Sequence, residues 1–230
     1  AVFHTVFFNS LAHIQHHYFL NSRAVTEKIS NPSWYIKESD DPLLEGLNEF
    51  DEILSDYLNY DNYEILLATG LTQKPVKKAT FYWRLKNHRD FLDKLSIKYS
   101  DVKPRMTRDF LIEFNNEENL KDAINKLDSI YEYESGIKLF NEIDNRGSSL
   151  FVVLTYPTDL TDKIFGFSDF SFNANETVSF VAIKNGEHSP KGYAFCSNGI
   201  KDYMIKDGDH VSKLFFTLKN FFLNDNADAV

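Results

Sequence analysis

The sequence predicts an α/β fold, with a mainly parallel sheet flanked by helices and a ferredoxin-like α+β insertion. At the start of the chain an apolar strand-like segment, a helix and a second apolar segment follow one another, which is the order of a parallel sheet with a crossover helix. Farther along, the order becomes strand, helix, strand, helix and two strands, which is typical of a compact α+β subdomain. We therefore expect an α/β core in two parts, 1–75 and 157–230, around an insertion at 76–156.

The elements of the first core part are predicted from the spacing of apolar residues. Val2 to Phe8 is a short apolar run typical of a buried strand, and Ser10 to Leu20 has the character of a helix. A second helix is expected to begin after Asp41, which can cap it, and its apolar positions recur at helical spacing from Pro42 to Leu58. Ile65 to Thr69 is expected to form a second buried strand.

The expected insertion alternates strands and helices. Its last two strands form a hairpin across Asp144 to Gly147, which is a good turn sequence. The second core part contains two strands, a joining loop and a long helix, followed by a frayed end at 224–230. The strands are predicted at 79–85, 107–114, 137–143, 149–155, 177–184 and 193–196, and the helices at 89–97, 117–130 and 209–223.

Composition narrows the class of protein. Hydrophobic residues make up 43% and charged residues 26%, as in a globular protein, and a net charge of −9 argues against a general nucleic-acid binder. No apolar stretch approaches the roughly 20 residues that span a bilayer, so we expect no membrane span. The single cysteine, Cys196, excludes an internal disulfide and favours a reducing compartment such as the cytoplasm.

Histidines close to the predicted first strand are candidate metal ligands. Asn9 and His13 lie four residues apart where that strand gives way to a helix, and ligands bind at the carboxyl ends of parallel strands. Imidazole nitrogen and amide oxygen are ligands that zinc accepts. The alternative is a histidine that caps the helix or packs in an aromatic core. His16 and His17 point in different directions on a helix, so only one of them can line such a site.

Two later segments also contain candidate site residues. His188 lies in a loop from Gly186 to Gly192 that can hold an imidazole rigidly, although an exposed histidine in an ordinary hairpin loop is the alternative. Arg105 and Arg108 lie at the entrance of a predicted strand and could hold an anionic substrate, since guanidinium pairs with phosphate or sulfate. A surface cluster of salt bridges is the other interpretation of these arginines.

The early and late histidine segments resemble the alkaline-phosphatase superfamily, and within it the type I phosphodiesterase and nucleotide pyrophosphatase branch. That family has an Asp-x-x-Gly-His segment after a strand, to which Asn9 to His13 corresponds, and a late Gly-x-His-x-x-x-Gly loop, which Gly186 to Gly192 matches. The resemblance covers about 1–75 and 157–223. It implies that His13, His188 and Asn9 bind zinc or another divalent metal, and that His17 contacts substrate or a ligand.

The chain departs from the family pattern at three places. Asn9 stands where the family has Asp, so one anionic ligand becomes a neutral amide. Ala68 to Leu71 stands where the family has Ser-Asp-His-Gly, so two metal ligands are replaced, and the family's nucleophile would lie before Val2. The resemblance thus implies the C-terminal part of a longer protein, in which two metals would act together. Two functions are expected. One is part of a metal-dependent phosphoester or sulfoester hydrolase, inactive as this fragment. The other is a metal-free scaffold that binds an anionic small molecule or glycan. A third interpretation is a plain α/β domain with coincidental motifs.

Overall fold

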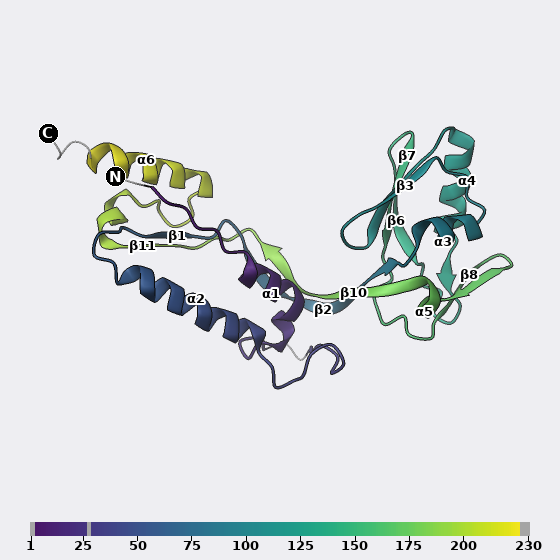
Figure 1. The fold of residues 1–230 in the computed structure, drawn as a ribbon, viewed down its shortest axis with the longest axis horizontal. Helices are drawn as coiled ribbons and strands as arrows, with labels where there is room; N and C mark the ends of the chain where they lie inside the picture. The colour runs from purple at the N-terminus through teal and green to yellow at the C-terminus, as the bar shows by residue number, and fades with distance from the viewer. Residues whose placement is uncertain (1–2, 27–28, 226–230) are drawn as a thin grey trace. The chain divides into compact units, whose positions relative to one another are not determined.

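The structure is a computed structural model that describes residues 3–26 and 29–225, and the chain divides into two compact units. The first unit combines Ala1–Lys78 with Asn185–Val230, and the second is Ala79–Lys184. Figure 1 labels most of the helices and strands of both units. Two long strands, β2 (Thr72–Leu85) and β10 (Val178–Ser189), pair with each other and contribute residues to both units.

The prediction of a mainly parallel sheet is wrong. Helices and small sheets are mixed, and each strand pair with a described register is antiparallel. The second apolar segment does form a strand, β1 (Leu66–Ala68), but it pairs antiparallel with β11 (Ala194–Cys196). The expected first strand is absent from the described part of Val2 to Phe8, where residues 3–8 form an exposed, irregular segment; Val2 lies outside the described residues. Without that strand, the predicted crossover helix does not connect two parallel strands.

The predicted helices of the first unit are confirmed. They are α1 (Ser10–Tyr18), continued by the 3₁₀ helix η1 (Phe19–Asn21), and α2 (Pro42–Leu58). Asp41 caps α2 by accepting a hydrogen bond from the Leu44 amide at 3.0 Å. α1 and α2 approach closely at Gly46, where a Cβ atom would lie 2.8 Å from the Ile14 side chain. Glycine therefore sets the distance between these two helices.

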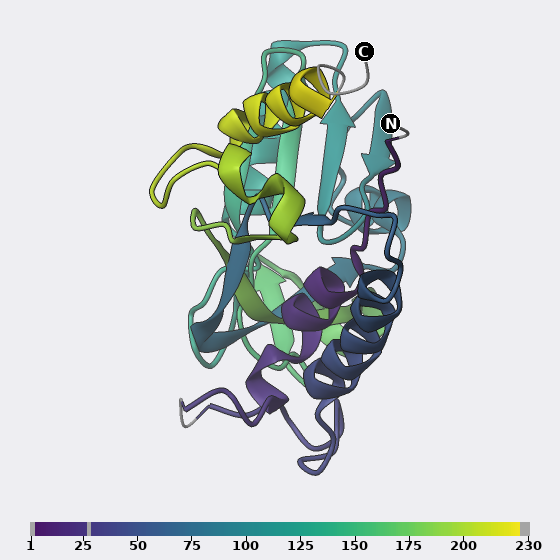
Figure 2. The same cartoon turned by 90° about the vertical axis from the view of Figure 1, so that its left-hand side faces the viewer.

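The C-terminal part of the first unit is helical, with short turns before the long helix. The 3₁₀ helices η2 (Asn198–Tyr203) and η3 (Val211–Lys213) precede α6 (Leu214–Asp225), which covers most of the helix predicted at 209–223. Figure 2 shows α6 and α2 as separate helices of this unit. The frayed end predicted at 224–230 lies outside the described residues from residue 226 onward.

The second unit contains two antiparallel sheets and three helices among its described elements. The larger sheet has the order β3-β4-β7-β6, and the smaller has the order β5-β8-β9. Two hairpins, β3–β4 and β6–β7, flank one helix, so this sheet does not have the β-α-β-β-α-β order of a ferredoxin-like insertion. The bounds are α3 (His88–Lys94), β3 (Asp101–Pro104), β4 (Asp109–Glu113), α4 (Glu117–Asp128), β5 (Tyr131–Glu132), β6 (Phe140–Asn145), β7 (Ser149–Leu154), β8 (Ile164–Phe167), β9 (Phe170–Asn173) and α5 (Ala174–Thr177).

The large hydrophobic core belongs to the second unit. Its buried members run from Trp83 to Val178, and Leu92, Phe110 and Phe140 are fully buried. By contrast, the buried apolar side chains described in the first unit are few: Leu20, Leu43, Val76 and Ile200. The first unit is instead held partly by buried polar contacts, in which the fully buried Asn185 accepts a hydrogen bond from the Leu20 amide at 3.0 Å and exchanges hydrogen bonds with Asn31.

Candidate functional site

Two histidines meet where α1 lies beside β10 in the first unit. The ring centroids of His16 and His188 are 4.9 Å apart, with the rings nearly perpendicular. His16 is half-buried on α1, and His188 is exposed one residue before the end of β10. The loop predicted from Gly186 to Gly192 is thus a strand through Ser189, and the strand direction positions the imidazole.

The structure places the predicted ligands Asn9 and His13 at the N-terminus of α1. Both side chains are exposed, and the amide of His13 donates to the carbonyl of Asn9 at 3.1 Å, which is the first turn of the helix. The Asn9 side chain makes no capping hydrogen bond. The ring contact of His188 is with His16, a residue for which sequence reasoning assigned no ligand role. His13 and His16 lie about one helical turn apart on α1, so sequence spacing alone could not show which of them meets His188.

Burial favours neutral imidazoles in this cluster. The pKa of His16 is lowered, first by desolvation and then by the positive charge that His188 would carry, although a hydrogen bond with the backbone of Gly186 opposes the shift. The pKa of His17 is also lowered, first by desolvation and then by His13. A neutral imidazole has a free lone pair, so these shifts suit metal ligation as well as ordinary packing.

The ligand set for zinc is incomplete in the described part of the chain. Within residues 3–26 and 29–225, no group of three or more His, Cys, Asp or Glu side chains is arranged to hold a metal ion. His17, the predicted substrate contact, has its Nδ1 3.3 Å from the hydroxyl of Tyr35. Zinc in catalytic sites takes three protein ligands, and the His16–His188 pair supplies two. The residues described here do not fit a catalytic zinc ion without a further donor.

Gln73 on β2 is a residue of this region that sequence reasoning missed. Its side-chain nitrogen donates to the carbonyl of Ala12 at 3.0 Å, whereas its Oε1 is a buried atom with no hydrogen-bond partner among the described residues. A Cβ atom on Gly186 would lie 2.4 Å from this Oε1, so Gly186 adjoins both Gln73 and His16. No motif in the sequence marks Gln73, because it lies in an ordinary polar run. Its place near Gly186 follows from the pairing of β2 with β10.

The arginines proposed to hold an anionic substrate belong to the second unit. The guanidinium of Arg108 lies over the ring of Tyr82, 4.3 Å from its centroid. Arg105 is exposed, and its amide donates to the carbonyl of Asp109 at 2.9 Å. Neither arginine forms an ion pair within the described residues, while the neighbouring Lys103 pairs with Glu113. The structure thus places Arg105 in solvent and Arg108 against an aromatic ring.

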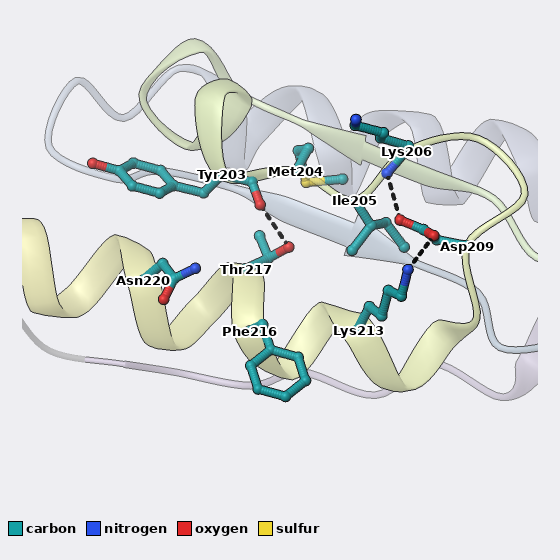
Figure 3. A pocket seen from close by; sticks show the side chains of 9 residues that line it. All are labelled: Tyr203, Met204, Ile205, Lys206, Asp209, Lys213, Phe216, Thr217 and Asn220. Atoms are coloured by element: carbon teal, nitrogen blue, oxygen red, sulfur yellow. Dashed lines mark hydrogen bonds and ion pairs between the residues drawn. The ribbon is translucent and has the colours of Figure 1, made fainter.

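A groove of about 390 Å³ lies between α6 and the segment that follows η2 (Figure 3). Thr217 donates to the carbonyl of Tyr203 at 2.8 Å, and Asp209 pairs with Lys213, so much of its polar lining is already satisfied. Its described lining has no histidine or cysteine and offers apolar contact and hydrogen bonds. The lining residues are Tyr203, Met204, Ile205, Lys206, Asp209, Lys213, Phe216, Thr217 and Asn220.

Exposed apolar side chains form the other notable surface, and they gather on the first unit. Within the described residues, the large exposed apolar side chains of the second unit are Met106, Tyr131, Tyr133 and Ile164. Those of the first unit come from the N-terminal segment, α2, β11, α6 and the loops that join the elements. They include Phe3, Val6, Phe7, Phe8, Leu44, Leu47, Ile53, Tyr57, Leu58, Leu71, Tyr193, Phe195, Phe215, Phe216 and Leu223.

Comparison with known proteins adds no relative. No protein-family model matches the chain, and neither a curated protein nor a solved structure matches it. None of the described helices combines the length and the apolar character that crossing a bilayer requires. The resemblance to the alkaline-phosphatase superfamily stays a prediction.

Proposed function

We propose that this chain is an interaction module whose first unit binds another polypeptide through its exposed apolar surface. The observation that carries the proposal is the unequal distribution of apolar side chains. The second unit buries its own, whereas the first leaves aromatic and aliphatic side chains exposed on three kinds of element. Exposed apolar side chains favour binding to a partner, since each Å² of apolar surface removed from water contributes about 25 cal/mol.

The two long helices of the first unit show the same feature. On α2, Leu47, Tyr57 and Leu58 lie on the helix face that also contains the buried Leu43, yet they are exposed. On α6, Phe215 and Phe216 are exposed although the helix packs on η2 through Thr217. These helix faces have the apolar composition of packed surfaces. A partner that covers them would remove apolar surface from water, which favours binding.

Site-specific photo-crosslinking in cells tests this proposal. A photoreactive benzoylphenylalanine is placed at Phe215, which is 64% exposed in the first unit, or at Met106, which is 89% exposed in the second. We expect a discrete polypeptide adduct from position 215 and none from position 106, because only the first surface is an interface. Equal adducts from both positions, or none from position 215, would contradict the proposal.

A second candidate function is supported by the His16–His188 pair. We infer as the second candidate a metal-dependent phosphoester or sulfoester hydrolase, in which this pair, with His13 or Asn9, supplies part of one metal site. Zinc would act there as a Lewis acid when bound. Anion binding by Arg105 and Arg108 is a separate proposal for the second unit.

Zinc titration calorimetry on the whole chain distinguishes this candidate. Stoichiometric zinc binding that is lost in His188→Ala and retained in His210→Ala would support it, because His210 lies just before η3 and its imidazole Nδ1 bonds to Ser212. Absence of zinc binding at saturating concentration would rule it out. The interaction module would be unaffected by that result.

A further inference from the structure

We propose that the outer edge of β1 accepts a β-strand from a basic partner polypeptide. This inference rests on the proposed interaction function and specifies how the partner binds. Three observations support it: the direction of the backbone groups of β1, the apolar character of the strand on both faces, and the charge of α2.

The hydrogen bonds of the β1–β11 pair show which backbone groups of β1 are unused. The Ser197 amide donates to the carbonyl of Ile65 at 2.9 Å, and the Thr69 amide donates to the carbonyl of Tyr193 at 2.8 Å. Hydrogen-bonded residues alternate along an antiparallel pair, so Leu67 is the next residue that bonds to β11. The backbone groups of Leu66 and Ala68 therefore point to the opposite edge.

No strand pairs with that edge in the described part of the chain. The sheet formed by β1 and β11 has two strands only, and a two-stranded sheet is marginally stable by itself. Edge strands are usually protected by lysine, proline or a bulge. Leu66, Leu67 and Ala68 provide none of these, so the edge is open to strand addition.

The side chains of β1 are those of an interior strand. Successive residues of a strand point to opposite faces, so Leu66 and Leu67 place an apolar side chain on each face of the sheet. Strands that are apolar on both faces normally lie inside a sheet. Both leucines are only half-buried here. A further strand would extend the sheet and shield both faces, which is the geometry of β-strand addition in peptide recognition.

The negative charge of α2 indicates that the partner is positively charged. This helix contains Glu45, Glu49, Asp51, Glu52 and Asp56 and no lysine or arginine, and none of these carboxylates forms an ion pair within the described residues. α2 and β1 are consecutive elements of the first unit, joined by residues 59–65, and the carboxylates of α2 give this part of the unit a negative field. Lysine or arginine beside the added strand is complementary to that field, whereas a second copy of the chain would bring a second acidic helix.

Short labelled peptides test the inference on the whole chain. One alternates valine and threonine between terminal lysines, and its control has glutamates in place of the lysines. Fluorescence anisotropy measures affinity, and amide hydrogen exchange followed by NMR locates the peptide. We expect the lysine peptide to bind more tightly and to protect the amides of Leu66 and Ala68. Protection of Ala194 and Cys196 instead, or equal affinity for both peptides, would overturn the inference.

Variants at position 68 isolate the backbone contribution. Ala68→Pro removes the outward amide while leaving the bonds to β11, and Ala68→Val keeps that amide in a residue that favours strands. We expect Ala68→Pro to weaken lysine-peptide binding by about tenfold, the loss of one backbone hydrogen bond, and Ala68→Val to retain it. Unchanged affinity of the lysine peptide for Ala68→Pro, with native circular dichroism, would refute strand addition. Self-association of the chain that Ala68→Pro abolishes would also overturn the inference, because the edge would then bind a second copy of the chain. Crosslinking at Phe215 without peptide binding would leave the interaction module standing and reject only this binding mode.

Discussion

Acidification should destabilise the second unit through His88. This side chain is 7% exposed, and its ring lies edge-on to Phe110 with the ring centroids 4.9 Å apart. Burial, and to a smaller extent the positive charge of Arg84, lowers the pKa of His88 to about 4. The folded chain therefore keeps this imidazole neutral at a pH where the unfolded chain protonates it.

The size of the effect follows from the two pKa values. A histidine in the unfolded chain has a pKa of 6.5, and the lower value in the folded chain corresponds to about 3 kcal/mol at about 1.36 kcal/mol per pH unit. Because the folded-state pKa is lowered, this stability is fully present above pH 6.5 and is lost as the pH falls from 6.5 towards 4. Protonation below that range affects both states equally.

Urea denaturation at pH 7 and pH 4 measures this loss. Trp83 lies in the core of the second unit and reports its unfolding, and a Trp34→Phe background removes the other tryptophan. We expect the free energy of unfolding to fall with acidification by about 3 kcal/mol more in the chain with His88 than in His88→Gln, which cannot be protonated. Carboxylates titrate in both chains and cancel in this comparison. An equal fall in the two chains would refute the assignment to His88.

Three further substitutions test the packing that supports the two units. Leu92→Ala in the core of the second unit should cost about 2–5 kcal/mol in urea denaturation, because Leu92 is fully buried and leaves a cavity; an exposed-site change, Lys94→Ala, is the control. Asp41→Ala should cost the first unit at least about 1 kcal/mol in thermal melting, and Asp41→Asn should recover only part of it, because its single oxygen can cap α2 while the Arg23 amide loses its acceptor. Asn185→Ala should cost about 1–3 kcal/mol, because the Leu20 amide and other buried partners lose their hydrogen bonds. The amide hydrogen of Leu20 should then exchange faster, and an unchanged exchange rate would contradict the prediction.

Local signals were sufficient for the helices and the hairpin. Asp41 and Pro42 mark the start of α2, because the first turn of a helix needs an acceptor for its free amides and tolerates proline. The turn between β6 and β7 contains Gly147 at φ +86°, a conformation that glycine adopts without strain. These features depend on residues a few positions apart, so the sequence alone displays them.

Strand pairing was the part that local signals could not decide. The run from Val2 to Phe8 has the composition of a strand, but its described residues are exposed and irregular because no neighbouring strand pairs with them. β1 was found correctly, yet its direction in the sheet depends on β11, more than a hundred residues later. Apolar composition indicates that a segment can be buried and does not indicate which segment will bury it.

The sequence by itself determined the longer helices α1 to α4 and α6, the strands β4, β6 and β7 of the second unit, and the presence of histidines at both ends of the first unit. It did not determine β3, β5, β8 and β9. Only the tertiary structure decided that His188 meets His16, that the sheets are antiparallel and that the first unit leaves apolar side chains exposed. Local conformation follows from hydrogen bonds and steric limits between near neighbours. The pairing of distant segments follows from which surfaces exclude water together, and that depends on the whole chain and its partners.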